Sequence, residues 1–506
     1  MGRTDPVVGY MEPRLGVESA SCRLIVFLFL ALALVRGVLY SVLIPPWQAP
    51  DEPQHYQMVR LIGDLGHVPS LNETCQASET YQVATVLHAE VVQSLRDNRF
   101  WEYRHRHLAP DLSDSRTDGE ILHDEKLTAT IGHPPIYYVL ASLALYPFRS
   151  SSLPVHLYVL RGLSVLLSIV TVWCVFTVGN WLSLDERGQR SADLTSRTWA
   201  ATLFAVFLPM HTFMSAAVNN DALAEMLASV TLTLVIWCCS RRFSYVHIIT
   251  LIVLLLLGLF TKRTVLFLLP LVLGFLAWKS PNQRIVGSAS YRPSGNTALL
   301  ARLVRSLTTF WVAKIILFLV ILTIVYILAF DGATQKCWDL PVRTSQLIQA
   351  DRYTSDAPNH YGIWVLLGFA SFWGNFGWMN IPLDVAWYVA LAVLTLGAML
   401  GALRGARRVW LARRENPTKC CVMIFCALAV LLVFAQSGAS MIVRQMPPQG
   451  RYLFPAMVPI ALGFTWGLFE WVPVRYHRLG LGVSIVSLIL FDLVSMLGYV
   501  LPYFYG

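Results

Sequence analysis

The sequence predicts an all-α polytopic membrane protein with about eleven transmembrane helices, and three observations support this fold class. Apolar stretches of about 20 residues, the length that crosses a bilayer as a helix, recur along the whole chain. Only 14% of the 506 residues are charged, whereas a soluble domain carries about 25%. Arginine and lysine are concentrated in alternate polar segments, which is the positive-inside pattern of a multi-pass protein.

The amino-terminal segment sets the orientation. Residues 1–22 are expected to be a cytoplasmic tail, because their basic residues lead into the first apolar run, 24–44. No cleavable signal pattern precedes that run, so we expect it to be retained as the first span of a single transmembrane domain, 23–506. Arg36 within the span is expected either to snorkel to the outer surface or to face a site.

Residues 45–156 are predicted to form a long extracytoplasmic loop. Two short helices are expected in it, at 53–64 and 81–95. The apolar stretch 132–148 either crosses the bilayer or lies in the interface. The arginine-rich segment 184–197 is expected to be cytoplasmic, so the span before it runs inward and 132–148 begins and ends outside. The sequence therefore favours an interfacial helix at 132–148.

The remaining spans follow from hydropathy and charge. They are predicted at 157–181, 199–218, 222–240, 246–260, 264–278, 307–330, 385–403, 420–439, 453–470 and 479–500. A second extracytoplasmic loop, 331–384, carries an aromatic helix. The densest basic run, 404–414, is cytoplasmic, and the carboxyl terminus is expected outside.

Net charge and cysteine usage exclude two classes of site. The net charge of +9 is assigned to topology, because no basic patch is combined with a nucleic-acid motif; no nucleic-acid partner is expected. No cysteine spacing resembles a zinc site. Cys75 and Cys337 fall in the two long outer loops, and the sequence leaves open whether they pair.

The topology places every chemically interesting polar cluster on the outer face. The first is PPWQAPDEPQHY, whose prolines end the first span and stiffen the chain as it leaves the membrane. Asp51 and Glu52 follow directly, with His55 one helical turn later. These carboxylates either cap the helix that begins at Pro53 or supply a general base, and the spacing does not choose between them.

Asp221 and His133 are candidates for the same site. Asp221 either caps the helix 222–240 or acts as a second carboxylate that positions a substrate hydroxyl or, with Asp51, holds a divalent cation such as Mg²⁺ or Mn²⁺. His133 is either an ordinary interfacial polar group or a site residue opposite the carboxylates.

Four outer-face cations complete the set. Lys262, Arg263, Arg444 and Arg451 either snorkel to lipid phosphates or clamp a phosphate leaving group. Arg451 is the strongest candidate, because Gln449 and Gly450 are expected to leave an open, flexible backbone before it.

Aromatic residues at the end of the second outer loop have two readings. Trp373, Phe376 and Trp378 either form an aromatic belt at the membrane surface or bound a pocket for a sugar or a lipid.

Together these motifs resemble a known superfamily. PDEPQH, HPPIYYVL, NNDALA, the TK of a broken hairpin, SFWGNFGWMNIPL and QGRYLFPAMVPI, in this order over about 24–460, resemble the GT-C integral-membrane glycosyltransferases. The closest resemblance is to a prokaryotic branch known only as predicted membrane proteins of unknown function.

The resemblance implies a fold, an activity and roles. It implies sugar transfer from a polyprenyl-phosphate sugar to a glycan, lipid or protein acceptor, on the extracytoplasmic side of a prokaryotic plasma membrane, in cell-envelope glycan biosynthesis. Asp51 or Glu52 would match the catalytic or metal-binding carboxylate of the family. Asp221 would match its later acidic residue, Lys262 its hairpin lysine and Arg451 its QGRY arginine. We expect an inverting transferase with a carboxylate base.

A transporter or flippase of a lipid-linked or anionic glycan is the alternative. Such a protein needs ionisable residues along a path through the bilayer. In this sequence the ionisable residues are expected to cluster at one surface and the spans are largely free of charge, so the enzyme is preferred.

Overall fold

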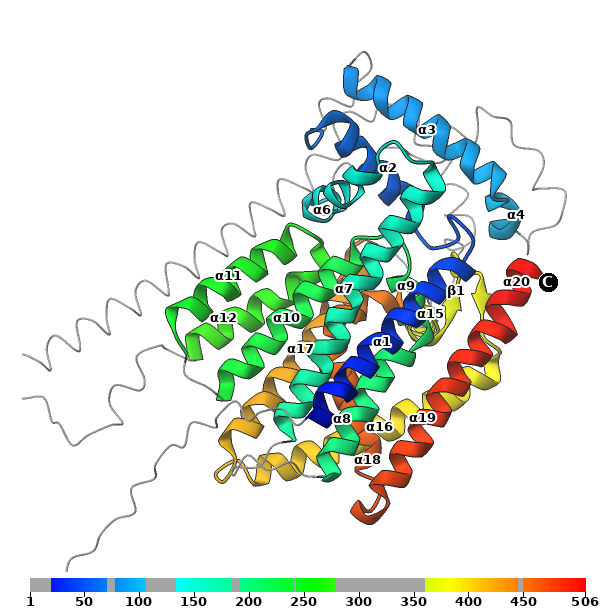
Figure 1. Ribbon diagram of the computed structural model, residues 1–506. Helices are drawn as coiled ribbons and strands as arrows, with labels where there is room; N and C mark the ends of the chain where they lie inside the picture. The colour runs from blue at the N-terminus through cyan, green and yellow to red at the C-terminus, as the bar shows by residue number, and fades with distance from the viewer. Residues whose placement is uncertain are drawn as a thin grey trace, which may run out of the picture.

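The computed structural model describes residues 20–70, 78–105, 133–183, 192–240, 243–278, 360–444 and 449–506. In Figure 1 the long helices run side by side in one bundle, and short helices lie across one end of it. The bundle helices are α1 (Ala20–Leu43), α7 (Leu153–Leu182), α8 (Ala192–Phe207), α9 (Pro209–Ser215), α10 (Asp221–Ser240), α11 (Tyr245–Leu259), α12 (Leu268–Trp278), α15 (His360–Trp373), α16 (Val385–Leu411), α17 (Pro417–Arg444), α18 (Met457–Phe469), α19 (His477–Leu493) and α20 (Leu501–Tyr505). The short helices across the end, named here the cap layer, are α2 (Glu52–Leu65), α3 (Glu79–Asp97), α4 (Phe100–His105) and α6 (Ile136–Leu145).

Tight or irregular turns connect several of these helices. They are η3 (Tyr146–Phe148), η4 (Arg263–Phe267), η6 (Gly450–Ala456), η7 (Val474–Tyr476) and the π-helical η8 (Val494–Val500), which joins α19 to α20.

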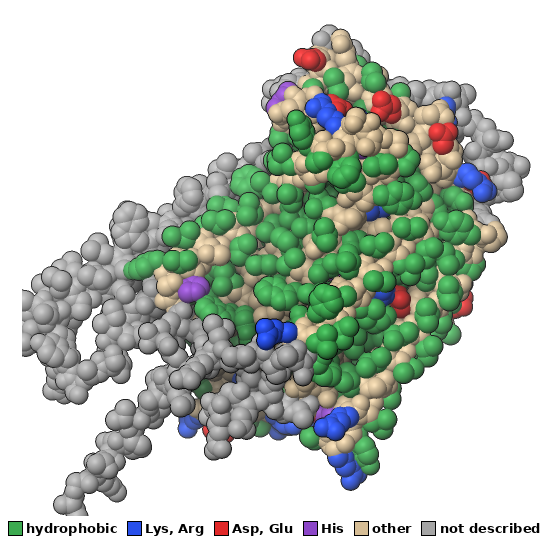
Figure 2. Space-filling view, in the orientation of Figure 1, with side chains coloured by type: hydrophobic (Ala, Val, Ile, Leu, Met, Phe, Trp, Pro, Cys, Tyr) green, Lys and Arg blue, Asp and Glu red, His purple; other side chains and the backbone are tan. Residues whose placement is uncertain are grey.

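The all-α membrane architecture is confirmed. Within the described residues, 7 helical stretches are long and apolar enough to cross a membrane: Arg23–Leu43, Leu153–Leu182, Asp221–Cys239, Val385–Leu411, Pro417–Ser440, Gly450–Phe469 and Val474–Tyr505. Figure 2 shows apolar side chains over the long helices and charged ones gathered mainly toward the two ends, as lipid contact requires. The predicted span 307–330 lies outside the described residues, so the total of eleven stays a prediction.

One predicted span is broken. The stretch 199–218 is divided into α8 and α9, because Pro209 lacks an amide N–H and its ring clashes with the preceding turn. The break turns His211 inward: its Nε2 lies 2.7 Å from Glu225 on α10, and both side chains are buried.

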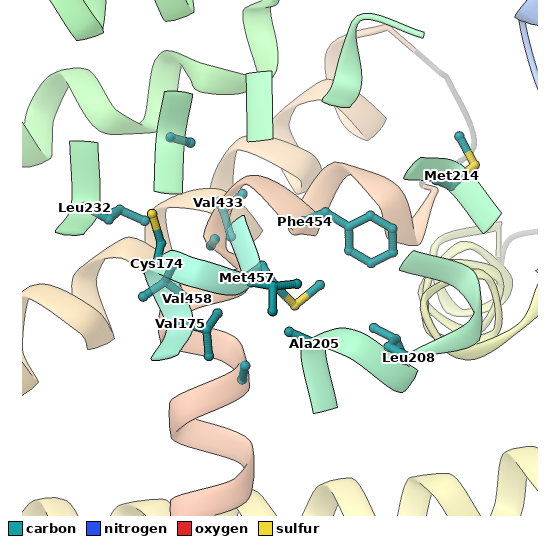
Figure 3. Packing of buried hydrophobic residues seen from close by; sticks show 14 of the residues in the cluster. Cys174, Val175, Ala205, Leu208, Met214, Leu232, Val433, Phe454, Met457 and Val458 are labelled. Carbon is teal, nitrogen blue, oxygen red and sulfur yellow. The ribbon is translucent and has the colours of Figure 1, made fainter. Parts of the chain in front are cut away.

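The bundle core is closely packed below the cap layer. Phe454 of η6 and Met457 and Val458 of α18 lie among side chains from α7, α8, α10 and α17, including Cys174 and Ala205 (Figure 3). This core holds η6 rigidly and thereby fixes the position of Arg451, which belongs to η6.

The cap layer has its own apolar core. Trp47, Tyr56, Tyr137, Tyr138 and the helix α7 meet there, and α6 packs against both α2 and α7. The two predicted short helices are confirmed as α2 and α3. The helix α6 lies in this layer (Figure 1), and its place in the membrane interface stays a prediction.

The aromatic stretch does not form a membrane-surface belt. Trp373 is 3% and Phe376 0% exposed. Phe376 belongs to β1 (Asn375–Phe376), which pairs antiparallel with β2 (Ile381–Pro382) in a short hairpin. The belt prediction is wrong for these two residues, because both pack in the bundle core, Trp373 from the end of α15 and Phe376 from the hairpin. Trp378 donates from Nε1 to the Trp47 carbonyl at 2.9 Å and so joins the hairpin to the chain before Asp51.

Arg36 neither snorkels nor faces the outer polar cluster. It forms a buried ion pair with Asp492 on α19, and Tyr40 donates its hydroxyl to the same carboxylate at 2.7 Å. The expectation of spans largely free of charge is therefore wrong: the bundle contains buried, mutually neutralised pairs that tie its helices together.

Candidate functional site

A buried arginine organises the chain where it leaves the first span. Arg161, in the first third of α7, donates to the carbonyls of Ser41, Ile44 and Pro45 at 2.7, 2.8 and 3.1 Å. Ser41 lies in the last turn of α1 and Ile44 and Pro45 directly follow it, where carbonyls have no partner within the helix. Arg161 therefore satisfies the end of α1 and fixes the start of the loop that leads to Asp51.

Glu52 completes this clamp. Arg161 donates to it from Nε at 2.8 Å and from Nη2 at 2.7 Å, and both side chains are 0% exposed. The backbone amides of Trp47 and Val218 also donate to the carboxylate, at 3.0 and 3.1 Å. Glu52 thus joins α2 to the segment before α10, and both of its oxygens are fully engaged.

The Asp51 side chain points away from the Arg161–Glu52 clamp. Its backbone is left-handed, with φ 63°, and its side chain makes no capping bond to α2. An L-residue held in this region signals a site that its surroundings enforce. Its carboxylate instead accepts from Arg451 Nη2 at 2.5 Å and is 44% exposed. The capping reading of Asp51 is wrong.

The Asp51 carboxylate is strongly held in its ionised form. Burial would raise the pKa of Asp51, but the Arg451 guanidinium outweighs that effect and holds the pKa well below its ordinary range.

A tight approach of η6 to α15 positions Arg451. The amide of Gly450 donates to Ser371 Oγ at 2.7 Å, and a Cβ at Gly450 would lie 2.1 Å from the Phe372 amide nitrogen. Gly450 is therefore a close-packing glycine, not the open backbone that the sequence suggested. Arg451 itself is 4% exposed, and its Nε and Nη1 have no hydrogen-bond partner among the described residues.

Asp221 and Lys262 form the second half of the site. Lys262 Nζ lies 2.7 Å from Asp221 Oδ1, and Arg451 Nη1 lies 3.8 Å from Asp221 Oδ2. The cap of α10 is made by Asn219, whose Oδ1 accepts from the Ala222 amide at 3.1 Å. The capping reading of Asp221 is wrong, and its carboxylate is available to the two cations.

Two histidines and a tyrosine line the side formed by the cap layer. His55 Nδ1 and His133 Nδ1 lie 2.9 and 3.1 Å from the Tyr138 hydroxyl. Burial and the charge of Lys262 lower the pKa of His55 to about 3 and that of His133 to about 4. Both imidazoles are therefore neutral near pH 7.

The site is electrically balanced and does not fit a divalent cation. Asp51 and Asp221 already share two fixed cations, Lys262 and Arg451. The described residues contain no group of three or more histidine, cysteine or acidic ligands arranged for a metal. A hard cation needs several oxygen ligands, whereas these two carboxylates are already paired with cations.

A protein-family profile described as "Predicted membrane protein (DUF2142)" matches residues 34–460. The chain belongs to this family. The matched region of this DUF2142 member contains Asp51, His133, Asp221, Lys262 and Arg451. No curated protein matches the chain. The match supports the membrane-protein part of the resemblance, and the relation to GT-C glycosyltransferases stays a prediction.

The structure brings together most of the predicted DUF2142 site. Asp51, Asp221, Lys262 and Arg451 are in direct contact, with the His55 and His133 pair beside them. Arg263 is near enough to lower the pKa of His133. The side chain of Arg444 and both Cys75 and Cys337 lie outside the described residues.

Two contributors to the site were not anticipated. Arg161 carried a signal, since a single arginine in an apolar span needs a buried partner. Tyr138 carried none, because a tyrosine in a short apolar helix is ordinary.

Proposed function

We propose that this protein is an inverting glycosyltransferase that moves a sugar from a polyprenyl-phosphate donor to an acceptor hydroxyl at the extracytoplasmic membrane surface. The multi-pass membrane architecture supports a lipid-linked donor, whose chain would lie in the bilayer with its sugar phosphate at the surface. The acceptor is a glycan, lipid or protein of the cell envelope.

One observation carries the proposal. Arg451 is almost fully buried, yet two of its nitrogens lack a hydrogen-bond partner among the described residues. Unused buried donors are costly, and arginine donors are well suited to phosphate oxygens. Lys262 lies on the other side of Asp221 and adds a second cation. This pair would bind the phosphate and stabilise its charge as the glycosidic bond breaks.

Asp51 is the proposed base. Its side chain is 44% exposed and touches Arg451. While that ion pair persists, the carboxylate is a weak base, because its pKa is held low. A donor phosphate on Arg451 would replace the Asp51 carboxylate there, release it and raise its basicity. Donor binding would thereby prepare the base.

The reaction balances with these groups alone. The acceptor oxygen attacks the anomeric carbon from the face opposite the phosphate, and the carbon–oxygen bond to the phosphate breaks with its electron pair. The acceptor proton passes to Asp51, and the lipid phosphate leaves on Arg451 and Lys262. A single displacement inverts the anomeric configuration.

Glu52 is assigned a structural role in this mechanism. Its oxygens already accept four hydrogen bonds, and it is fully buried against Arg161. A base must reach the proton that it removes, and Glu52 has no exposed atom with which to do so.

A transporter or flippase of a lipid-linked glycan is the second candidate. It is favoured by the buried ionisable pairs Arg36–Asp492 and His211–Glu225 inside the bundle. In both pairs the polar atoms contact each other, which is typical of structural ties between helices as well as of transport paths.

Transfer of radiolabelled sugar in membranes tests the proposal. Wild type and the Arg451→Gln variant are given a panel of polyprenyl-phosphate sugars, with Arg404→Gln on α16 as the charge-matched control. We expect label on acceptor with wild type and the control, and at least a hundredfold less with Arg451→Gln, about the loss for one transition-state donor. Equal transfer by Arg451→Gln would overturn the phosphate clamp. No transfer by wild type, with flipping of the labelled lipid, would favour the transporter.

A further inference from the structure

We propose that a hollow between α2 and α3 binds a neutral carbohydrate, namely an inner sugar unit of the acceptor glycan whose terminal hydroxyl reaches Asp51. The hollow lies in the cap layer, apart from the contact between Asp51 and Arg451, and no motif in the sequence points to it. The inference rests on the proposed function for its role, because it selects a glycan among the possible acceptors. The binding of the carbohydrate is tested without any transfer reaction.

The hollow is an open groove with a volume of about 360 Å³, within the range of about 300 to 1,000 Å³ that is usual for ligand pockets. Residues of α2 line one part of it and residues of α3 another, and these two helices pack against each other. Its apolar surface is formed by Val83, Val86 and Leu87 of α3. The other lining residues are polar and come from three segments of the cap layer, so the hollow combines an apolar surface with several hydrogen-bonding groups.

Arg60 is the fixed polar group of the hollow. Its Nη1 donates to the Tyr56 hydroxyl at 3.2 Å and to His156 Nδ1 at 2.9 Å. His156 can accept at Nδ1 because its Nε2 donates to the Phe148 carbonyl at 2.8 Å. The Nε of Arg60 is buried and has no hydrogen-bond partner among the described residues. Since an unused buried donor costs free energy, Arg60 is held in place and keeps one donor beside the hollow that a ligand can use.

Glu90 lines the hollow from α3, and its carboxylate is exposed. Burial lowers the pKa of Arg60, but nearby oxygens, those of Glu90 among them, outweigh burial and raise it. Glu90 is therefore close enough to act on Arg60 through space, yet the two side chains form no ion pair. A ligand between them can donate to the carboxylate and accept from the guanidinium.

Arg149 also lines the hollow and is only loosely held. Its Nη2 lies 3.5 Å from Asp64 Oδ1, and Arg60 Nη2 lies 3.4 Å from Asp64 Oδ2. Both distances exceed the usual range for a hydrogen bond, and the Arg149 side chain is 51% exposed. An exposed pair of this kind contributes little free energy, so Arg149 can turn toward a ligand at small cost.

The charge balance selects the class of ligand. Two cations, Arg60 and Arg149, and two carboxylates, Asp64 and Glu90, leave the lining without net charge. A phosphate or a polyanion would meet as many like charges as opposite ones. A hydroxyl both donates and accepts, so a sugar can bridge the carboxylate and the arginines. The C–H face of its ring can then pack on the apolar residues of α3.

The length of α2 indicates a chain of sugars. Asp51 directly precedes this helix, whereas Arg60 and Asp64 lie in its last turns. The nine residues from Asp51 to Arg60 correspond to about 14 Å of helix. A ligand that occupies the hollow and also reaches Asp51 is therefore an oligosaccharide and not a single sugar.

Binding of labelled oligosaccharides tests the proposal. Neutral oligosaccharides are released from cell-envelope glycans by mild acid, separated by size and labelled with 2-aminobenzamide. Their binding to purified full-length protein in nanodiscs is measured by fluorescence polarisation. Val86→Trp fills the hollow, and its control is Thr85→Trp, an exposed neighbour on α3 that does not line it. We expect wild type and Thr85→Trp to bind equally, and Val86→Trp to bind at least tenfold more weakly.

A second pair of variants tests the polar contacts without a change in net charge. Glu90→Gln combined with Arg149→Gln should weaken binding at least tenfold, because both lost groups form charge-assisted hydrogen bonds with the sugar. Asp97→Asn combined with Arg96→Gln, two exposed residues of α3 outside the hollow, should bind as wild type. If Val86→Trp unfolds early in a thermal scan, the Glu90 and Arg149 double variant alone carries the test.

Three results would overturn the carbohydrate site. They are equal binding by wild type and both hollow variants, no neutral oligosaccharide that binds wild type, and binding restricted to anionic oligosaccharides. Absence of sugar transfer by a wild-type protein that binds oligosaccharides through the hollow would reject the glycosyltransferase and leave the carbohydrate site standing. The two failures are therefore read from different experiments.

Discussion

Arg451 Nη2 lies 2.5 Å from Asp51 Oδ2, although the two residues are 400 positions apart in the chain. The arginine is buried and the carboxylate is half exposed, with side-chain exposures of 4% and 44%. A buried cation therefore holds a reachable carboxylate, and any anion that binds Arg451 must compete with Asp51.

This competition predicts an increase in affinity on removal of the carboxylate. Asp51→Asn should bind polyprenyl phosphate, the lipid product, about fivefold more tightly than wild type, since a partly exposed ion pair is worth about 1 kcal/mol. Binding is measured with purified protein in nanodiscs, and Glu415→Gln on the α16–α17 turn is the control. Unchanged or weaker binding by Asp51→Asn would show that phosphate does not replace Asp51 on Arg451.

Glu52 should be needed for stability more than for chemistry. Glu52→Gln leaves the buried Arg161 guanidinium without a counter-charge, which costs about 3 to 5 kcal/mol for a buried pair. We expect a lower thermal midpoint and poor recovery, while Asp51→Asn unfolds close to wild type. A Glu52→Gln protein with normal unfolding but no transfer activity would identify Glu52 as the base.

Acid should destabilise the fold before ordinary carboxylates titrate. The pKa of His55 is lowered to about 3, below the value of about 6.5 expected in the unfolded chain. Below about pH 6.5 the unfolded state therefore binds a proton that the folded state does not, and stability falls as pH decreases toward 3. This group contributes at most about 1.4 kcal/mol per pH unit.

Thermal unfolding between pH 7.5 and 4.5 measures this effect. His55→Gln should show a shallower fall in midpoint over that range than wild type. The pH window separates it from Asp51, whose lowered pKa adds stability that is lost only at more acid pH. Parallel curves for the two proteins would mean that His55 is protonated in the fold.

Chelation should not abolish transfer. Asp51 and Asp221 are neutralised by Arg451 and Lys262, so a divalent cation is not needed to hold them together. We expect transfer in excess EDTA to remain within about twofold of the untreated reaction. Loss of transfer, restored by Mg²⁺ or Mn²⁺ but not by Na⁺ of equal ionic strength, would assign these carboxylates to a metal.

A pair of cysteines tests the packing of two spans. Cys239 Sγ on α10 lies 3.6 Å from Cys421 Sγ on α17, close to bonding range. Copper-phenanthroline, as the oxidant, should form a disulfide between them in membranes. After proteolytic cleavage within 279–305, the disulfide would hold the two fragments together and shift the band on a non-reducing gel. Cys421→Ser should abolish the shift, and Cys420→Ser, the neighbouring position, should leave it. No cross-link in wild type would contradict the placement of α10 against α17.

The sequence could predict the elements because their signals are local. The length of each apolar run predicts α1, α7, α10, α16 and α17, since the bilayer sets how long a spanning helix must be. Pro209 breaks the predicted span 199–218, and proline is a local helix-breaking signal that the sequence contains. The prediction of an unbroken span rested on hydropathy alone. The sequence also predicted that the polar site residues share one face of the membrane, because the positive-inside pattern assigns their segments to the same side.

What only the tertiary structure decided is which of these residues touch. Asp51 and Glu52 are neighbours, but Glu52 begins α2 whereas the left-handed backbone of Asp51 turns its side chain in another direction. One carboxylate therefore meets Arg161 inside the clamp, and the other meets Arg451. Spacing along the chain cannot reveal this, because it depends on how each helix is rotated in the bundle and on how closely Gly450 lets η6 approach α15. The sequence by itself determined a membrane bundle with carboxylates at the exit of its first span; packing decided which carboxylate is locked away and which remains exposed.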